Sequence, residues 1–454
     1  MVFKSINPAT GLLRAEFSVH GKADINRLLA QAWEGYRVWS VNSMVDRAAF
    51  LVRLAELLEQ RADQYAALIT GEMGKPVGEA RAEVMKAASG ARHFAEAGPR
   101  YLADELIEGT AGTVVYEAIG PIFGVMPWNL PFWQVLRFFI PAAIAGNVVL
   151  VKHADLVQGS AQALEDLVRD AGGPAGVYTN LRVRRDAVSG IIADPRVRAA
   201  TVTGSTAAGR AVAEAAGAHG KKAVLELGGS DPFIVFEDAD FDKAVSIGVV
   251  SRFSNNAQSC IAAKRFLIAA PIFDRYCEAF ARTASALPIG DPMDPMTKLG
   301  PLAKADLVET TQRQIAEAVA VGGRVIAGGK PKDGPGNFFE PTVIVGVDPD
   351  AAIAQEEFFG PVALMFPFTS EAEAVARANA TDFGLGGAVW TSDPHRARRV
   401  VAQLEAGAVF VNDFVRSDPR APFGGVKGSG FGRELGPLGA RELTNAKLVW
   451  NLPA

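Results

Sequence analysis

Cysteine and histidine are both scarce in this chain of 454 residues. Only two cysteines occur, Cys260 and Cys277, so the sequence predicts no disulfide framework and favours a reducing compartment, with the cytoplasm as the expected location. The five histidines are scattered and show no metal-ligand spacing, which argues against a histidine-based zinc or iron site. We therefore expect chemistry that needs no resident metal ion.

A strong net charge and a long uninterrupted apolar run are absent too. The formal net charge is −4, which does not indicate the basic surface that nucleic-acid-binding proteins usually carry. The longest apolar stretch, 135–151, is broken by Arg137, Pro141 and Gly146 and makes a poor bilayer span, and the first ten residues do not resemble a secretory signal. We expect a small-molecule substrate rather than a nucleic-acid or membrane partner.

Apolar β-branched segments alternate with helical tracts, which predicts parallel βαβ units in an α/β protein of two or three domains. Two further strands, 113–117 and 447–451, are predicted outside these units, where they could pair with another subunit. The first unit is predicted from strands at 148–151, 199–202 and 223–227 and helices at 158–169 and 207–216. The second is predicted from strands at 232–236, 266–269, 362–366, 388–390 and 409–411.

Cys260 ends a polar run that begins at Asn255, immediately before an apolar segment resumes. A thiolate in such a loop can attack an electrophile. The alternative is a small buried structural residue, which is the more common fate of a single cysteine. Cys277 is assigned to that alternative because it lies in a helical tract, 273–283, with no chemical group around it.

Glu226 ends an apolar strand and is followed by Gly228 and Gly229. A carboxylate at the carboxyl edge of an open α/β sheet faces the ligand crevice, and burial there raises its pKa towards the range of a general base. A surface carboxylate before a turn is the alternative.

Two further turns carry candidate groups. Gly204, Ser205 and Gly209 lie where a strand runs into a helix, whose first amides could hold a pyrophosphate, although the spacing is not that of the usual dinucleotide fingerprint. Asn129 stands between Pro127 and Pro131 after a predicted strand and is a candidate oxyanion donor, with a turn asparagine as the alternative.

Taken together, these segments resemble the NAD(P)-dependent aldehyde dehydrogenase superfamily over nearly the whole chain, most closely its short succinate-semialdehyde dehydrogenases. The resemblance implies an α/β aldehyde dehydrogenase fold with a Rossmann-like cofactor domain, an α/β catalytic domain and a small β oligomerisation arm. The segments that carry it are 127–129, 151–152, 203–205, 226–229, 258–260, 356–361 and 422–430.

The resemblance also implies boundaries and an assembly. The NAD(P)-binding domain is expected over 1–99 and 119–228, the catalytic domain over 229–435, and the oligomerisation arm over 100–118 and 436–454. A homodimer or homotetramer follows from the resemblance and not from composition.

In the chemistry that the resemblance implies, Cys260 attacks the aldehyde while the Asn129 amide and the Cys260 backbone N–H hold the oxyanion. Hydride passes to the nicotinamide, and water activated by Glu226 hydrolyses the remaining thioester to a carboxylic acid. Sulfur is nucleophilic near neutral pH, and a carboxylate can take a proton from water, so the residue types suit these steps.

The family positions place several residues on the cofactor. Asp155 follows Lys152 by three residues, and its carboxylate favours NAD by repelling a 2′-phosphate, whereas the neighbouring His153 leaves NADP possible. The expected cofactor-binding residues are Trp128, Lys152, Asp155, Gly204, Ser205, Gly209, Glu357 and Phe359.

The substrate is expected to carry a carboxylate, as succinic semialdehyde does. Arg137, in an otherwise apolar helix eight residues after Asn129, matches a substrate-binding arginine, helped by Ser417. The alternative is that Arg137 pairs with a structural carboxylate, and Arg416 or Arg420 could also supply the charge. Another ω-carboxylated or small aliphatic aldehyde stays open, while acyl transfer to coenzyme A is disfavoured because it needs no water-activating base.

The chain departs from the family at Ala257, where a glycine is usual. If that backbone has a positive φ, alanine costs roughly 1 kcal/mol. We expect tolerance, with a change in the mobility of the loop around Cys260.

Overall fold

The computed structural model describes residues 1–451 and contains two α/β layers and two small antiparallel sheets. Residues 452–454, which the predicted arm includes, lie outside the described residues. No helix within residues 1–451 is long and apolar enough to cross a bilayer.

The first layer is a six-stranded sheet in the order β17-β9-β8-β5-β6-β7, parallel except for β17, which runs antiparallel to β9. Its strands are rich in buried Val, Ile and Ala because helices cover both faces of a parallel sheet. The strands are β5 (Pro121–Val125), β6 (Val148–Lys152), β7 (Tyr178–Asn180), β8 (Ala199–Thr203), β9 (Lys222–Glu226) and β17 (Gly430–Phe431).

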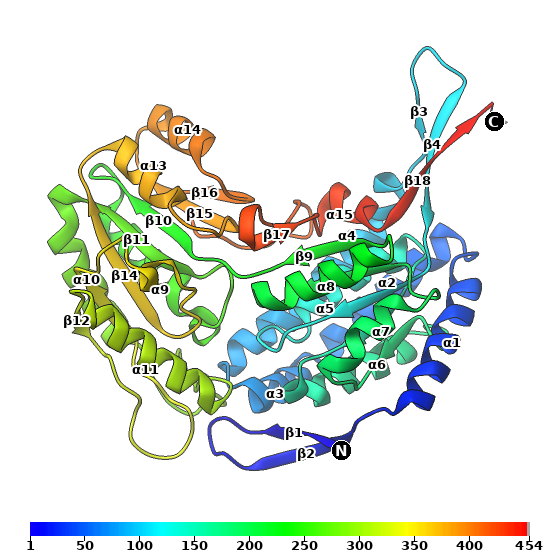
Figure 1. Cartoon of the computed structure of the whole chain (residues 1–454), viewed down its shortest axis with the longest axis horizontal. Helices are drawn as coiled ribbons and strands as arrows, with labels where there is room; N and C mark the ends of the chain where they lie inside the picture. Colours follow the sequence, from blue (N-terminus) through cyan, green and yellow to red (C-terminus); the bar gives the residue numbers. More distant parts are fainter. Residues whose placement is uncertain (452–454) are drawn as a thin grey trace.

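The helices around this sheet come from the first half of the chain (Figure 1). Gly74 ends α3 with a φ of 85°, a left-handed conformation that glycine adopts without strain. The helices are α1 (Lys22–Trp39), α2 (Met44–Gln60), α3 (Ala62–Met73), α4 (Val77–Tyr101), α5 (Trp133–Ile144), α6 (Gln158–Asp170), α7 (Val188–Ala193) and α8 (Thr206–Ala218).

The second layer is a seven-stranded sheet in the order β12-β13-β14-β11-β10-β15-β16, parallel except for β12. Its strands are β10 (Asp231–Val235), β11 (Ala263–Ala269), β12 (Arg324–Ala327), β13 (Thr342–Val345), β14 (Val362–Phe368), β15 (Gly386–Trp390) and β16 (Ala408–Val411). Its helices are α9 (Phe241–Phe253), α10 (Phe273–Ser285), α11 (Ala305–Ala320), α12 (Ala352–Gln355), α13 (Glu371–Asn379) and α14 (Pro394–Gln403).

An arm projects from the body and ends near the C-terminus (Figure 1). The two strands predicted at 113–117 and 447–451 are present, and in this chain they pair with each other, with Lys447 opposite Val115. The arm consists of β3 (Glu105–Leu106), β4 (Gly112–Ala118) and β18 (Thr444–Trp450), which follows α15 (Gly436–Glu442), and a separate hairpin is formed by β1 (Val2–Ile6) and β2 (Leu13–Ser18).

The connections between strands decide where reactive side chains meet. The adjacent strands β5, β8 and β9 end next to Asn129, Ser205 and Glu226, so these residues share one edge of the first sheet. The loops that carry Cys260 and Glu357 enter the adjacent parallel strands β11 and β14 and therefore share one edge of the second sheet. The expected α/β fold is confirmed, and its two edges meet at one cavity.

Candidate active site

A cavity of about 260 Å³ is lined by residues from both layers. Its size is close to the lower end of the range for small-molecule sites, about 300–1,000 Å³. It brings together eight of the residues that the sequence indicated, which are Trp128, Asn129, Gly204, Ser205, Glu226, Cys260, Glu357 and Phe359.

Cys260 is partly exposed at the cavity, whereas Cys277 is buried in the core of the second layer. Burial raises the pKa of the Cys260 thiol to about 12, although the positive charges of Lys264 and Arg137 act in the opposite direction. The thiol is therefore protonated at neutral pH until a change in its surroundings favours the thiolate.

Three consecutive residues before Cys260 have left-handed backbones. Asn255, Asn256 and Ala257 have φ values of 56°, 54° and 61°. Side chains hold the loop in place: the Asn255 N–H donates to Glu79 at 2.6 Å, and the Asn256 amide donates to the carbonyls of Gly74 and Pro301. Asparagine tolerates this conformation better than alanine does, so Ala257 is the strained residue.

Replacing Ala257 with glycine should leave the free energy of unfolding unchanged or raise it by less than about 1 kcal/mol, because relief of left-handed strain offsets the greater entropy of the unfolded chain. Ala88 is equally buried but lies in helix α4, so Ala88→Gly should cost about 1 kcal/mol. Urea unfolding of both variants measures the difference. Equal destabilisation of the two variants would show that Ala257 is not strained.

The Asn129 amide is fixed next to the cysteine loop. Its Nδ2 donates to the carbonyl of Gln258 at 2.8 Å, and Asn255 Nδ2 donates to that same carbonyl and to the carbonyl of Asn129. An amide nitrogen has two hydrogens, so one orients the side chain and the other is available for an oxyanion.

Glu226 is a buried carboxyl group at the end of β9. Burial and the nearby Glu434 raise its pKa well above the usual value, while Arg137 and Arg433 oppose this shift. Within residues 1–451 neither oxygen of Glu226 has a hydrogen-bond partner. An unpartnered carboxyl group with a raised pKa has the properties of a general base at neutral pH.

The other end of the cavity combines a helix N-terminus with two aromatic rings, groups that suit phosphates and a flat ring. The Ser205 side chain caps α8 by accepting from the Ala208 N–H at 3.3 Å, and Ser205 itself lines the cavity. A helix N-terminus of this kind favours phosphate groups. A methyl group added at Gly204 would contact nothing closer than 4.0 Å, so the turn leaves room for a ligand. Phe359 packs edge-on against Trp128 with ring centroids 5.7 Å apart, and both rings line the cavity.

Glu357 accepts a hydrogen bond from the Gly229 N–H at 3.1 Å and lies 3.7 Å from Lys264 Nζ. Lys264 is fully buried and also donates to the carbonyls of Ser259 and Cys260. Sequence reasoning missed Lys264, although a lysine at the start of an apolar strand four residues after Cys260 was a usable signal. The lysine therefore connects the cysteine loop with the Glu357 carboxylate.

Three expected cofactor residues lie outside the cavity lining. Lys152, at the end of β6, lies 3.3 Å from the exposed Asp155. A Cβ at Gly209 would overlap with the Leu227 side chain, so the absence of a side chain allows α8 to pack closely on the end of β9. Close helix–strand packing is also the role of the third glycine in dinucleotide-binding folds.

Arg137 and Ser417 also lie outside the cavity lining. Arg137 is 3% exposed, forms an ion pair with Glu434 and lies 4.5 Å from the centre of the Phe423 ring. This is the structural pairing that the sequence left open, yet Arg137 Nη2 has no hydrogen-bond partner within residues 1–451. Ser417 accepts hydrogen bonds from Lys86 and Trp133.

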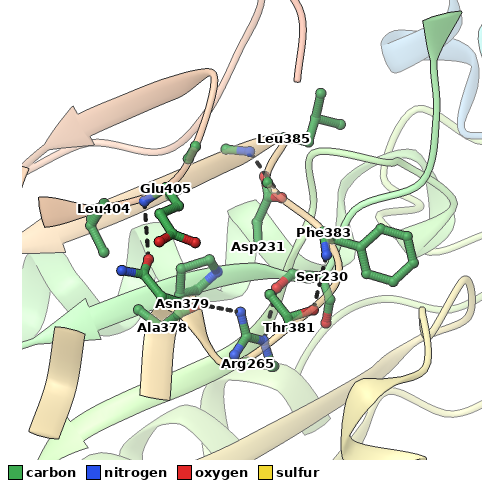
Figure 2. A pocket seen from close by; sticks show the side chains of 15 residues that line it. Ser230, Asp231, Arg265, Ala378, Asn379, Thr381, Phe383, Leu385, Leu404 and Glu405 are labelled. Atoms are coloured by element: carbon green, nitrogen blue, oxygen red, sulfur yellow. Dashed lines mark hydrogen bonds between the residues drawn. The ribbon is translucent and has the colours of Figure 1, made fainter. Parts of the chain in front are cut away.

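A second hollow lies within the second layer. Figure 2 shows Asp231, Ser230 and Arg265 at its wall. Arg265 donates to the carbonyl of Ser230, and Asp231 accepts from the Gly386 N–H at 3.1 Å. Its volume of about 10 Å³ has room for one water molecule, which excludes it as a substrate site.

Comparison with known proteins gives one consistent result. The profile of the aldehyde dehydrogenase family matches residues 1–449. A protein of Synechocystis sp. named a probable succinate-semialdehyde dehydrogenase [NADP(+)] is 44% identical, over 99% of this chain and 100% of its own. A succinate-semialdehyde dehydrogenase [NADP(+)] of Deinococcus radiodurans is 45% identical, over 99% of this chain and 95% of its own.

Solved structures agree with these relatives. The crystal structure of succinic semialdehyde dehydrogenase from Streptococcus pyogenes, in complex with NADP+, superposes with a TM-score of 0.96 at 37% identity and covers 100% of both chains. These matches confirm the resemblance expected from the sequence motifs. The chain belongs to the aldehyde dehydrogenase family.

Proposed function

We propose that this protein oxidises succinic semialdehyde to succinate with NAD(P) as hydride acceptor. The observation that carries the proposal is that Cys260, Asn129 and Glu226 meet in one cavity, which also contains the start of helix α8 and two aromatic rings. The names of relatives 44–45% identical over the full chain support the choice of aldehyde.

In the first half-reaction Cys260 loses its thiol proton to water, and its sulfur bonds to the aldehyde carbon. The carbonyl oxygen becomes an oxyanion, which the free hydrogen of the Asn129 amide and the Cys260 N–H hold. Bound NAD(P)+ supplies the acceptor for the hydride that leaves this carbon. Ser205, Glu357, Trp128 and Phe359 would hold that cofactor, with Lys152, Asp155 and Gly209 supporting its adenosine side.

In the second half-reaction Glu226 takes a proton from water, whose oxygen attacks the thioester carbon. The C–S bond breaks, the acid is released and sulfur leaves as the thiolate. This use of Glu226 distinguishes hydrolysis from acyl transfer to coenzyme A, which needs no such base. Another ω-carboxylated or small aliphatic aldehyde is the second candidate substrate.

Steady-state NADH formation without coenzyme A tests the proposal. Succinic semialdehyde should give a higher kcat/KM than glutaric semialdehyde, and a much higher one than butanal, which has four carbons and no carboxylate. Activity that depends on coenzyme A, or an equal kcat/KM for butanal, would contradict it.

For the cofactor we propose a preference for NAD, with NADP also accepted. Asp155 carries the preference because its carboxylate repels a 2′-phosphate, and Lys152 at 3.3 Å weakens that repulsion. Asp155→Ser should raise kcat/KM for NADP by about 10-fold and leave the value for NAD within a few-fold, since an exposed charge contributes on the order of 1 kcal/mol. Initial rates with both cofactors measure this, and an unchanged ratio would remove Asp155 from the selection.

We further propose a cytoplasmic homodimer or homotetramer built through the arm, 100–118 and 436–454. The cofactor domain then comprises 1–99 and 119–228, and the catalytic domain 229–435. Leu106, Leu448 and Trp450 of the arm are exposed apolar side chains, which supports burial against another subunit.

A further inference from the structure

Lys86 is a half-buried lysine on α4, and no carboxylate within residues 1–451 forms an ion pair with it. Glu83 and Asp418 are the acids that raise its pKa, and both are engaged elsewhere. Glu83 pairs with Lys75 and accepts from the N–H groups of Phe132 and Trp133 at the start of α5. Asp418 pairs with Arg420 at 2.6 Å. The ammonium group therefore lacks a counter-charge.

Lys86 contacts one hydroxyl group and one aromatic ring. Its Nζ donates to Ser417 Oγ at 2.8 Å and lies 4.8 Å from the centre of a Trp133 ring. Ser417 Oγ also accepts from Trp133 Nε1 at 3.0 Å. Two donors thus occupy the lone pairs of one hydroxyl group, and its own hydrogen is left to donate to an external acceptor.

The cluster adjoins the reaction centre through α5. Trp133 and Arg137 are four residues apart and share one face of this helix. The charge of Arg137 interacts with both Cys260 and Glu226, and it also interacts with Lys86. Arg137 therefore lies near both Lys86 and the reaction centre, and its Nη2 has no hydrogen-bond partner within residues 1–451.

The electrostatics of the cluster favour an anion. Burial and the neighbouring Arg137 lower the pKa of Lys86 to about 8, with a smaller contribution from Arg416. A carboxylate placed against Nζ would reverse this shift and stabilise the ammonium form. The charged groups that face Lys86 are Arg137 and Arg416 of positive sign and the two engaged acids, Glu83 and Asp418.

We propose that Lys86 binds the carboxylate of the aldehyde substrate, with the Ser417 hydroxyl and the free Nη2 of Arg137 as further donors. The inference deepens the proposed function and rests on it. It assigns substrate selection to a residue of α4, because the Arg137 guanidinium is already paired with Glu434.

The experiment compares succinic semialdehyde with butanal in the full-length protein. Lys86→Met should raise KM for succinic semialdehyde by about 10- to 100-fold, since a hydrogen bond between two charged groups is lost, and should change kcat/KM for butanal less than 3-fold. Lys86→Arg should recover part of the loss. Lys221→Met is the matched control, because Lys221 is also half-buried and has a lowered pKa, but its ammonium group donates to the carbonyls of Ile192 and Asp194.

A second measurement does not need turnover of the semialdehyde. Succinate should inhibit butanal oxidation competitively in the wild type and in Lys221→Met, and at least 10-fold more weakly in Lys86→Met. Equal losses on both aldehydes, or unchanged succinate inhibition in Lys86→Met, would overturn the inference. A wild type that does not prefer succinic semialdehyde over butanal would instead overturn the proposed function.

Discussion

Cys260→Ala should lower aldehyde oxidation by at least about 10⁴-fold, because the sulfur that forms both covalent intermediates is gone and water alone cannot replace it. The substitution removes one atom at the cavity wall, so the fold and the dinucleotide end of the cavity should be retained. NADH formation gives the activity, and quenching of tryptophan fluorescence on NAD binding shows that the cofactor end is intact.

Cys277→Ala is the control for this substitution. Cys277 is buried in the core of the second layer and faces no part of the cavity, so its replacement should cost about 1 kcal/mol of stability and leave kcat within 2-fold. Aldehyde oxidation that survives in Cys260→Ala and disappears in Cys277→Ala would reverse the assignment of the nucleophile.

The parallel strands were predictable because burial on both faces gives them a simple pattern. The strands predicted at 148–151 and 199–202 are observed at Val148–Lys152 and Ala199–Thr203. Knowing where such strands end also places Asn129, Ser205 and Glu226 at one sheet edge. The family glycine at position 257 suggested a left-handed backbone there. Ala257 has that conformation, with a φ of 61°.

Partners that lie far apart in the sequence could not be predicted. Arg137 was recognised as an unusual charge in an apolar helix, but its partner Glu434 follows it by 297 residues, and no local pattern connects the two. Lys86 gave no signal, because a lysine on an amphipathic helix is normally solvated. Its burial depends on Trp133 and Ser417, which the tertiary fold alone brings to it.

Glu226→Gln should separate the two half-reactions. Hydride transfer does not need the carboxylate, so the first turnover should release about one NADH per active site in a burst, whereas the steady-state rate should fall by about 10²- to 10⁴-fold because thioester hydrolysis has lost its base. Rapid-mixing absorbance at the NADH band measures both phases. In a single-turnover reaction with the enzyme in excess over the aldehyde, hydroxylamine added after the burst should attack the thioester and release the acyl group as a hydroxamate, with the thiol of Cys260 regenerated.

The pH dependence of kcat tests the assignment of Glu226 as the base independently. A base acts only when deprotonated, so wild-type kcat should fall as the pH drops through the pKa of Glu226, which burial and Glu434 place well above the usual value. This acidic limb should be absent from Glu226→Gln and present in Glu165→Gln, a half-buried glutamate of α6 whose pKa is also raised. If Glu226→Gln slowed the burst as much as the steady state, Glu226 would act before hydride transfer, and its place in the mechanism would move to the deprotonation of Cys260.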